Sequence, residues 1–181
     1  DNRWDFSETH TCPIPQEFKT LIEEYLHTVL TSDAPNKGWK IPETTLVYPW
    51  IVRLFPDIRY IHWVRDPRDC ILGSHLTDDL GDFGIRYEKT DDIRTNRAIS
   101  WLYQREIMHA TPMPEHVISV RFEDMVFHQD ETLARLEKFL GIPMAKIEMR
   151  TDSVGRYKTD DGVHMFPFFQ AEMDELGYAA E

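Results

Sequence analysis

The stretch "IHWVRDPRDCILGSH" (61–75) takes a short apolar run directly into a group of alternating charges. Arg65 follows the run, and Asp66, Pro67 and Asp69 have the order of an N-cap, a first helical residue and a capping-box acid. A helix start accounts for the acids and the proline, but not for Arg65. A guanidinium beside the positive end of a helix is unfavourable unless an anion binds there. Arg65 is therefore predicted to bind a phosphate-like group.

Two further side chains of this stretch need an interpretation. Arg68 is interpreted as a surface residue that forms an ion pair. Ser74 is expected to lie further along the same helix, where its hydroxyl would add a hydrogen bond to an anion held by Arg65.

The elements that would position these side chains alternate between strand and helix. The β-branched and aromatic runs at 57–64 and 116–122 predict buried strands. Apolar periodicity predicts helices at 15–32, 93–110 and 129–143, the last of them ending at Gly141 and Pro143. Further helices are expected within 39–55 and before Gly177. The pattern predicts an α/β fold with a parallel central sheet flanked by helices, in which ligands bind beyond the carboxyl ends of the strands.

Length and composition limit the class of protein. The 181 residues, 41% of them hydrophobic, are expected to form a single domain over 1–181. The net charge of −12 argues against nucleic acid as a partner. No apolar stretch is long enough to be a transmembrane segment. Two cysteines without a CxxC spacing suggest a reducing compartment, and a cytoplasmic location is expected.

Several segments together resemble the sulfotransferases that use 3′-phosphoadenosine 5′-phosphosulfate. These segments are "FPDIRYIHWVRDPRDCILGSH", "HVISVRFEDM", "VGRYK" and "GWKIPETT", which occur in the order and at the kind of element boundary typical of that family. The resemblance runs from about Trp39 to the C-terminus. It implies a P-loop NTPase-like sulfotransferase fold, with 3′-phosphoadenosine 5′-phosphosulfate as co-substrate and no metal.

The resemblance also implies roles for individual residues. Arg65 and Ser74 would bind the 3′-phosphate, Phe122 would lie against the adenosine, and Arg156 and Lys158 would close over the same phosphate. The alternative for Phe122 is ordinary buried aromatic packing. Glu123 and Asp124 are expected to organise the end of their strand, with Arg121 paired to one of them.

Two departures from the family pattern stand out. The family serine usually falls eight residues after the arginine, where this chain has Gly73, so Ser74 comes one residue later. The family also opens with a strand and a Gly-Thr-rich loop for the 5′-phosphosulfate, and residues 1–38 contain no such loop. The natural protein is therefore expected to extend N-terminally, with the P-loop portion missing from this chain.

Sulfuryl transfer needs positive charge at the leaving phosphate and a base for the acceptor proton. Lys40, in the Lys-plus-Pro element, is predicted to stabilise the leaving group; an exposed structural lysine is the alternative. Glu43 is the nearest candidate base, although a first-turn acid that favours its helix is equally consistent with the pattern. His62 is interpreted as a strand histidine, and His75 as a possible contact near the phosphate.

The acceptor is expected to be a small molecule or a glycan with a hydroxyl or an amine, selected by the exposed, acidic loop 76–92. The tryptophans are interpreted as core or strand-face packing. Two alternatives remain open: a P-loop-related nucleotide or nucleoside kinase, and a catalytically degenerate nucleotide-binding domain.

Overall fold

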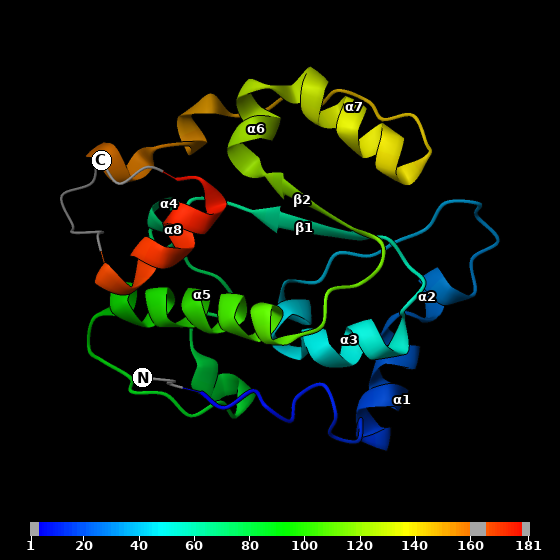
Figure 1. Cartoon of the computed structure of the whole chain (residues 1–181), viewed down its shortest axis with the longest axis horizontal. Helices are drawn as coiled ribbons and strands as arrows, with labels where there is room; N and C mark the ends of the chain where they lie inside the picture. Colours follow the sequence, from blue (N-terminus) through cyan, green and yellow to red (C-terminus); the bar gives the residue numbers. More distant parts are fainter. Residues whose placement is uncertain (1–3, 160–165, 179–181) are drawn as a thin grey trace. The chain divides into compact units, whose positions relative to one another are not determined.

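The computed structural model describes residues 4–159 and 166–178. Part of the predicted basic tail segment 154–164 lies outside these residues. The elements, shown in Figure 1, are α1 (Gln16–Tyr25), α2 (His27–Leu30), η1 (Pro42–Val47), α3 (Tyr48–Leu54), β1 (Tyr60–Val64), α4 (Pro67–Cys70), η2 (Leu80–Phe83), α5 (Ile93–Ala110), β2 (Val117–Arg121), α6 (Phe122–Phe127), α7 (Gln129–Leu140), η3 (Thr151–Ser153), η4 (Arg156–Thr159), η5 (Pro167–Phe169) and α8 (Gln170–Leu176).

The chain forms two compact units. The first comprises Asp1–Phe55 and Tyr103–Pro112, and the second comprises Pro56–Leu102 and Met113–Glu181. The long helix α5 therefore contributes its N-terminal part to the second unit and its C-terminal part to the first.

The second unit contains the sheet, in which β1 and β2 run parallel. Tyr60 pairs with Val117 and Val64 with Arg121 at the two ends of the register. Parallel strands need a long crossover connection, and α5 lies within it. The prediction of a mixed α/β fold with parallel strands is confirmed at this level, since the sheet among the described residues has two strands. The larger P-loop-like sheet stays a prediction.

Hydrophobic clusters of the second unit involve both strands. Val64 of β1 packs in one cluster with Ile71, which follows α4, with Ala98 of α5, and with Phe169, Met173 and Tyr178 of the C-terminal segment. Val120 of β2 packs in another cluster with α6 and α7, through Met125, Leu133 and Leu136. Apolar burial therefore fixes the carboxyl ends of both strands, which Arg65 and Phe122 directly follow.

Aromatic contacts hold the first unit together. The rings of Trp4 and Phe6 pack edge-on against Tyr103, with ring centroids 5.0 and 5.4 Å apart. Phe18 of α1 contacts Trp50 of α3 in the same manner at 4.8 Å. Such edge-to-face pairs add to the burial of each ring.

The tryptophan rings show both kinds of packing that were predicted, in the core and on a strand face. Trp101 packs against Phe169 with centroids 5.2 Å apart. Trp63, in contrast, is 50% exposed and lies on the open side of β1 with Ile61, where it contacts Phe122 edge-on at 6.3 Å. It is a strand-face residue and not a core residue.

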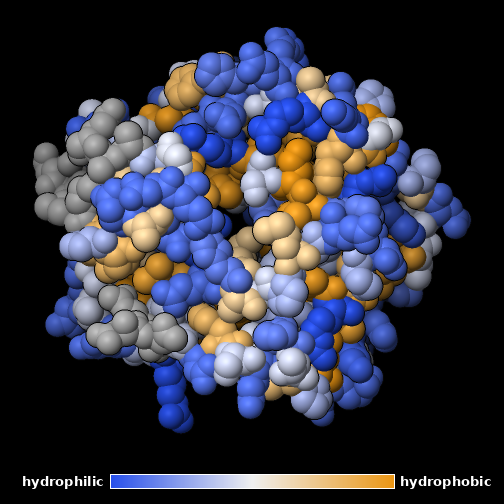
Figure 2. All heavy atoms as spheres, in the orientation of Figure 1, coloured by the Kyte–Doolittle hydropathy of each residue, from blue (hydrophilic) through white to orange (hydrophobic). Residues whose placement is uncertain are grey.

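Loop 76–92 is mostly exposed, as predicted, but Leu80 anchors it. The Leu80 side chain is fully buried, and the carbonyl of Thr77 accepts a hydrogen bond from the buried Ser100 hydroxyl. On the face shown in Figure 2, hydrophilic residues cover most of the surface and hydrophobic side chains appear between them. Within residues 4–159 and 166–178, the structure has no helix with the length and apolarity that crossing a membrane requires.

Candidate functional site at the carboxyl end of the strands

Asp66 and Arg68 form a buried pair directly after β1. The Asp66 carboxylate accepts the main-chain N–H of Arg68 at 2.9 Å, which is the predicted N-cap bond of α4. The same carboxylate receives the Arg68 guanidinium, with Nη2 2.7 Å from Oδ2. Arg68 is 3% exposed, so the prediction of a surface residue is wrong, although the ion pair is confirmed. Burial is tolerated because the charge is matched by the fork of hydrogen bonds.

Asp69 does not complete a capping box. Its carboxylate accepts hydrogen bonds from the main-chain N–H groups of Gly155 at 2.7 Å and of Tyr157 at 3.1 Å. The donor that a capping box would use, the N–H of Asp66, instead bonds to Glu123 at 3.0 Å. The expected local cap is therefore replaced by two long-range contacts, because the end of β2 brings Glu123 within reach of Asp66.

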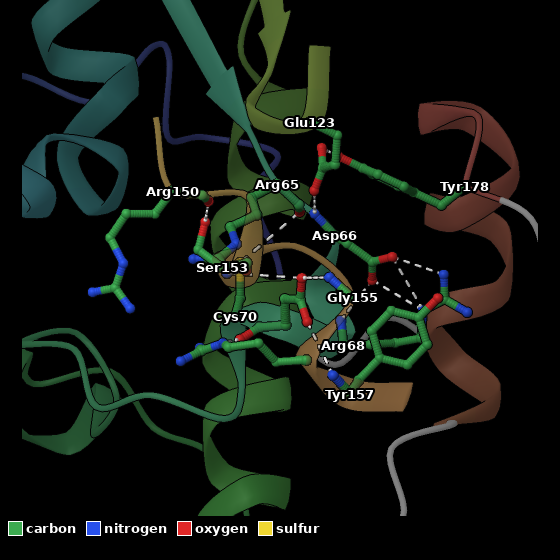
Figure 3. Close-up of polar contacts among 12 residues, drawn as sticks. Arg65, Asp66, Arg68, Cys70, Glu123, Arg150, Ser153, Gly155, Tyr157 and Tyr178 are labelled. Atoms are coloured by element: carbon green, nitrogen blue, oxygen red, sulfur yellow. Dashed lines mark hydrogen bonds and ion pairs between the residues drawn. The ribbon is translucent and has the colours of Figure 1, made fainter. Parts of the chain in front are cut away.

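Arg65 lies where β1 ends, as predicted, and neighbouring groups partly compensate the charge of its guanidinium (Figure 3). Its Nη2 donates to the carbonyl of Ser153 and lies 3.7 Å from the Asp69 carboxylate. Its Cζ is 4.8 Å from the centroid of the Phe122 ring. The side chain is 24% exposed, and its Nε has no hydrogen-bond partner among the described residues. Since the side chain is partly exposed, the terminal N–H groups of the guanidinium keep donor capacity for an anion, which agrees with a phosphate-like ligand; the buried Nε is not accessible to one.

Glu123 connects the two strand ends to the C-terminal segment. One oxygen accepts the Asp66 N–H and the other accepts the hydroxyl of Tyr178 at 2.8 Å. Burial, reinforced by Glu123, raises the pKa of Tyr178 far above its usual value. The predicted structural role of Glu123 is confirmed. Arg121 does not follow the predicted pairing but lies over the Tyr178 ring, 4.3 Å from its centroid, and donates to Gly177.

The basic residues of η4 belong to the same cluster. Arg156 donates from Nη2 to the main-chain carbonyl of Asp69 at 3.4 Å, and the Arg68 guanidinium lies 4.0 Å from the centroid of the Tyr157 ring. Lys158 extends along the same ring, with Nζ 5.8 Å from the centroid. The strand-end cluster thus comprises four cations, Arg65, Arg68, Arg156 and Lys158, and three carboxylates, those of Asp66, Asp69 and Glu123. It has one cation more than carboxylates, in a chain of net charge −12.

Ser74 is not on the helix that was predicted to carry it. α4 ends at Cys70, and Ser74 lies exposed in the segment that follows. The helix ends because the chain turns there: Arg97 donates to the carbonyl of Ile71 at 3.2 Å and binds Asp78 at 2.9 Å. A contribution of Ser74 to an anion site stays a prediction.

Lys40 and Glu43 belong to the first unit, whereas Arg65, Phe122, Arg156 and Lys158 belong to the second. Lys40 is exposed before η1, and Glu43 is half-buried in the first turn of η1. Their catalytic roles stay predictions. The structure thus brings Arg65 and Arg156 to Asp69, and Phe122 to Arg65.

Cys70 is a potential nucleophile that sequence reasoning did not weigh. Its sulfur lies 3.9 Å from the carbonyl of Arg65, close to the cluster. Burial raises the pKa of the Cys70 thiol to about 12, so the thiol stays protonated at neutral pH. The cysteine is therefore a packing residue.

A family model for the Sulfotransferase family matches residues 5–146. The chain belongs to this family, and the match supports a function of the sulfotransferase type. The matched range contains Lys40, Glu43, Arg65 and Phe122, while the η4 residues lie beyond it. No curated protein and no solved structure matches the chain.

Proposed function

We propose that this chain transfers a sulfuryl group from 3′-phosphoadenosine 5′-phosphosulfate to an acceptor hydroxyl or amine. The observation that carries the proposal is Arg65, a partly compensated guanidinium at the carboxyl end of a parallel strand, against Phe122 and beside the basic η4. The carboxyl ends of parallel strands are where such folds bind ligands. The family match supports the reaction class.

In the proposed site, Arg65, Arg156 and Lys158 bind the 3′-phosphate of the donor, Ser74 adds a hydroxyl, and Phe122 contacts the adenosine. Arg65 suits a phosphate because its fork of N–H donors matches phosphate oxygens. Phe122 already holds the Arg65 guanidinium over its ring, which fixes the orientation of the cation.

The donor supplies a sulfuryl group on a phosphosulfate anhydride; its sulfur–oxygen bond breaks as the bond to the acceptor oxygen or nitrogen forms. Lys40 would neutralise the charge that develops on the departing phosphate oxygen. The Glu43 carboxylate would take the proton of the acceptor hydroxyl or amine. The acceptor is a small molecule or a glycan in this proposal, with loop 76–92 contributing to its selection.

The test compares the binding of 3′,5′-bisphosphoadenosine, AMP and ATP by isothermal calorimetry, with thermal shift as a second measurement. We expect selective binding of the bisphosphate, which at one hundred times its Kd stabilises the protein by about 2.7 kcal/mol. Arg65→Ala should lose this selectivity. Arg59→Ala is the matched control, because Arg59 is an exposed arginine just before the opposite end of β1.

Equal affinity for AMP and the bisphosphate would contradict a 3′-phosphate site. A preference for ATP would favour the kinase alternative. Bisphosphate binding without sulfuryl transfer to any of a panel of hydroxyl and amine acceptors would favour the degenerate nucleotide-binding domain.

A further inference from the structure

Asp69 is the most completely buried carboxylate of the strand-end cluster, and it contacts a segment far away in the sequence. It is 0% exposed, and its two oxygens accept the N–H groups of Gly155 and Tyr157, 86 and 88 residues further along. Figure 3 shows Gly155, Tyr157 and Arg65 converging beyond the end of β1. A charge is buried in this way only where the fold compensates it directly.

Two simpler roles for Asp69 do not fit these contacts. A helix-capping acid would accept the N–H of Asp66, but Glu123 accepts that donor. A counterion for Arg65 would lie closest to the guanidinium, but the Asp69 carboxylate is 3.7 Å from Arg65 Nη2 and only 2.7 Å from the N–H of Gly155. The shorter distances show that the Asp69 carboxylate primarily accepts hydrogen bonds from main-chain N–H groups.

The two N–H groups that Asp69 holds flank Arg156. Because the 154–155 and 156–157 peptides are both held by Asp69, the position of the Arg156 Cα relative to α4 is restricted as well. Gly155 adopts a φ of +74°, a conformation that residues with a side chain rarely adopt, and this bends the segment toward Asp69. The Arg65 contact with Ser153 holds the same segment two residues earlier.

We propose that Asp69 is a positioning residue of the donor site, which fixes the η4 cations Arg156 and Lys158 at a set distance from Arg65. This inference rests on the proposed function, since it assigns the cations to one ligand, the 3′-phosphate. Asp69 does not touch the ligand. It acts through the main chain of residues 155–157.

The first test is made on the unmodified protein without ligand. Hydrogen–deuterium exchange resolved to single amides should show Gly155 and Tyr157 strongly protected, because a buried carboxylate accepts both N–H groups. In Asp69→Asn, the side chain keeps its volume but loses one acceptor oxygen, and exchange at one of the two amides at least should accelerate by tenfold or more. Unprotected amides in the unmodified protein would overturn the proposal whether or not the variant folds.

The second test measures the ratio of the affinities for 3′,5′-bisphosphoadenosine and AMP. A merely structural role of Asp69 would not change this ratio. Asp69→Asn should lower the affinity for 3′,5′-bisphosphoadenosine by at least tenfold and leave the affinity for AMP unchanged, because AMP lacks the 3′-phosphate. Gly155→Ala should reproduce this selective loss without altering any charge. Asp130→Asn is the matched control, an exposed acid of α7 whose ion-pair partner is the exposed Lys146.

The outcomes separate this inference from the proposed function. An unmodified protein that fails to prefer the bisphosphate contradicts the proposed function, and with it the role of Asp69. An unmodified protein that prefers the bisphosphate, while Asp69→Asn and Gly155→Ala retain the same preference, contradicts the role of Asp69 alone. Equal loss of affinity for AMP and the bisphosphate would indicate general unfolding of the site and would also overturn the inference.

Discussion

At the scale of single residues, Tyr178 shows how a hydroxyl can secure a distant segment. It is 5% exposed, and its O–H donates to the same Glu123 carboxylate that accepts the N–H of Asp66. A buried carboxylate oxygen that loses its donor keeps the cost of desolvation. The hydroxyl of Tyr178 therefore matters beyond its own hydrogen bond.

Tyr178→Phe should lower the free energy of unfolding by about 1–2 kcal/mol, because the ring stays packed while one oxygen of Glu123 loses its partner. Urea titration measures the change. Tyr25→Phe is the control, since Tyr25 is 66% exposed, and it should change stability very little. Equal effects of the two substitutions would contradict the assigned bond.

The same bond makes stability depend on alkaline pH. Because the pKa of Tyr178 is raised in the folded protein, its contribution is complete below the usual tyrosine pKa of about 10 and is lost as the pH rises above that value. The stability difference between the unmodified protein and Tyr178→Phe should therefore narrow above about pH 10. A stability difference that grows as the pH rises above about 10 would contradict a raised pKa of Tyr178 in the folded protein.

At the scale of elements, one half-buried acid, Asp79, connects the middle of loop 76–92 to its later part. Asp79 accepts the N–H of Gly81 and the hydroxyl of Tyr87, each at 2.9 Å, and pairs with Lys89. These bonds, above all that to Lys89, hold the pKa of Asp79 below its usual value. The tether therefore persists at neutral pH and is lost only as the pH falls below the ordinary aspartate range.

Asp79→Asn should accelerate hydrogen exchange across residues 80–89 severalfold, because the tether of the loop is weakened. The melting temperature should change little, since the anchor Leu80 stays buried. Mass-resolved exchange at pH 7 measures the effect, with Asp91→Asn as a control at an exposed acid of the same loop. If both variants exchange alike, Asp79 does not order the loop.

Local signals allowed several elements to be predicted from the sequence. The bounds of α5 are those expected, 93–110, because its apolar period is long and Asp92 caps it through the N–H groups of Arg94 and Thr95. The strands are shorter than predicted, and the helix expected over 15–32 is divided at Leu26 into α1 and α2. Ends of elements depend on tertiary contacts that periodicity does not encode.

Only part of the candidate site could be predicted from the sequence. Arg65 at the end of a strand was predictable, since strand pattern and helix-start residues meet there. The contacts of Asp69 were not, because the acid imitates a local cap and its partners are 86 and 88 residues away. The burial of Arg68 was missed for the same reason, since Tyr157 covers its guanidinium.

At the scale of the whole molecule, the net negative charge of the protein repels the proposed anionic ligand. The net charge is −12, whereas the strand-end cluster has one more cation than carboxylates. At 10 mM salt the screening length is about 30 Å, so an approaching bisphosphate is repelled by the molecule as a whole. At 150 mM the screening length is about 8 Å, and the local cations dominate.

The association rate constant for 3′,5′-bisphosphoadenosine should therefore rise between 10 and 150 mM sodium chloride, on the order of severalfold. Stopped-flow fluorescence with a labelled bisphosphate measures it, and an uncharged adenosine analogue is the control. A rate constant that falls with salt would mean that local attraction governs the approach even at long range.

The contact between Asp69 and Gly155 has a consequence for biosynthesis. The two residues are 86 positions apart, and translation adds about 5–20 residues per second. Several seconds therefore pass in which the newly made aspartate is hydrated and lacks its partners. A nascent chain arrested after β2 but before Gly155 would contain both strands but no basic turn, and ribosome-bound intermediates of this kind should be the forms most dependent on chaperones.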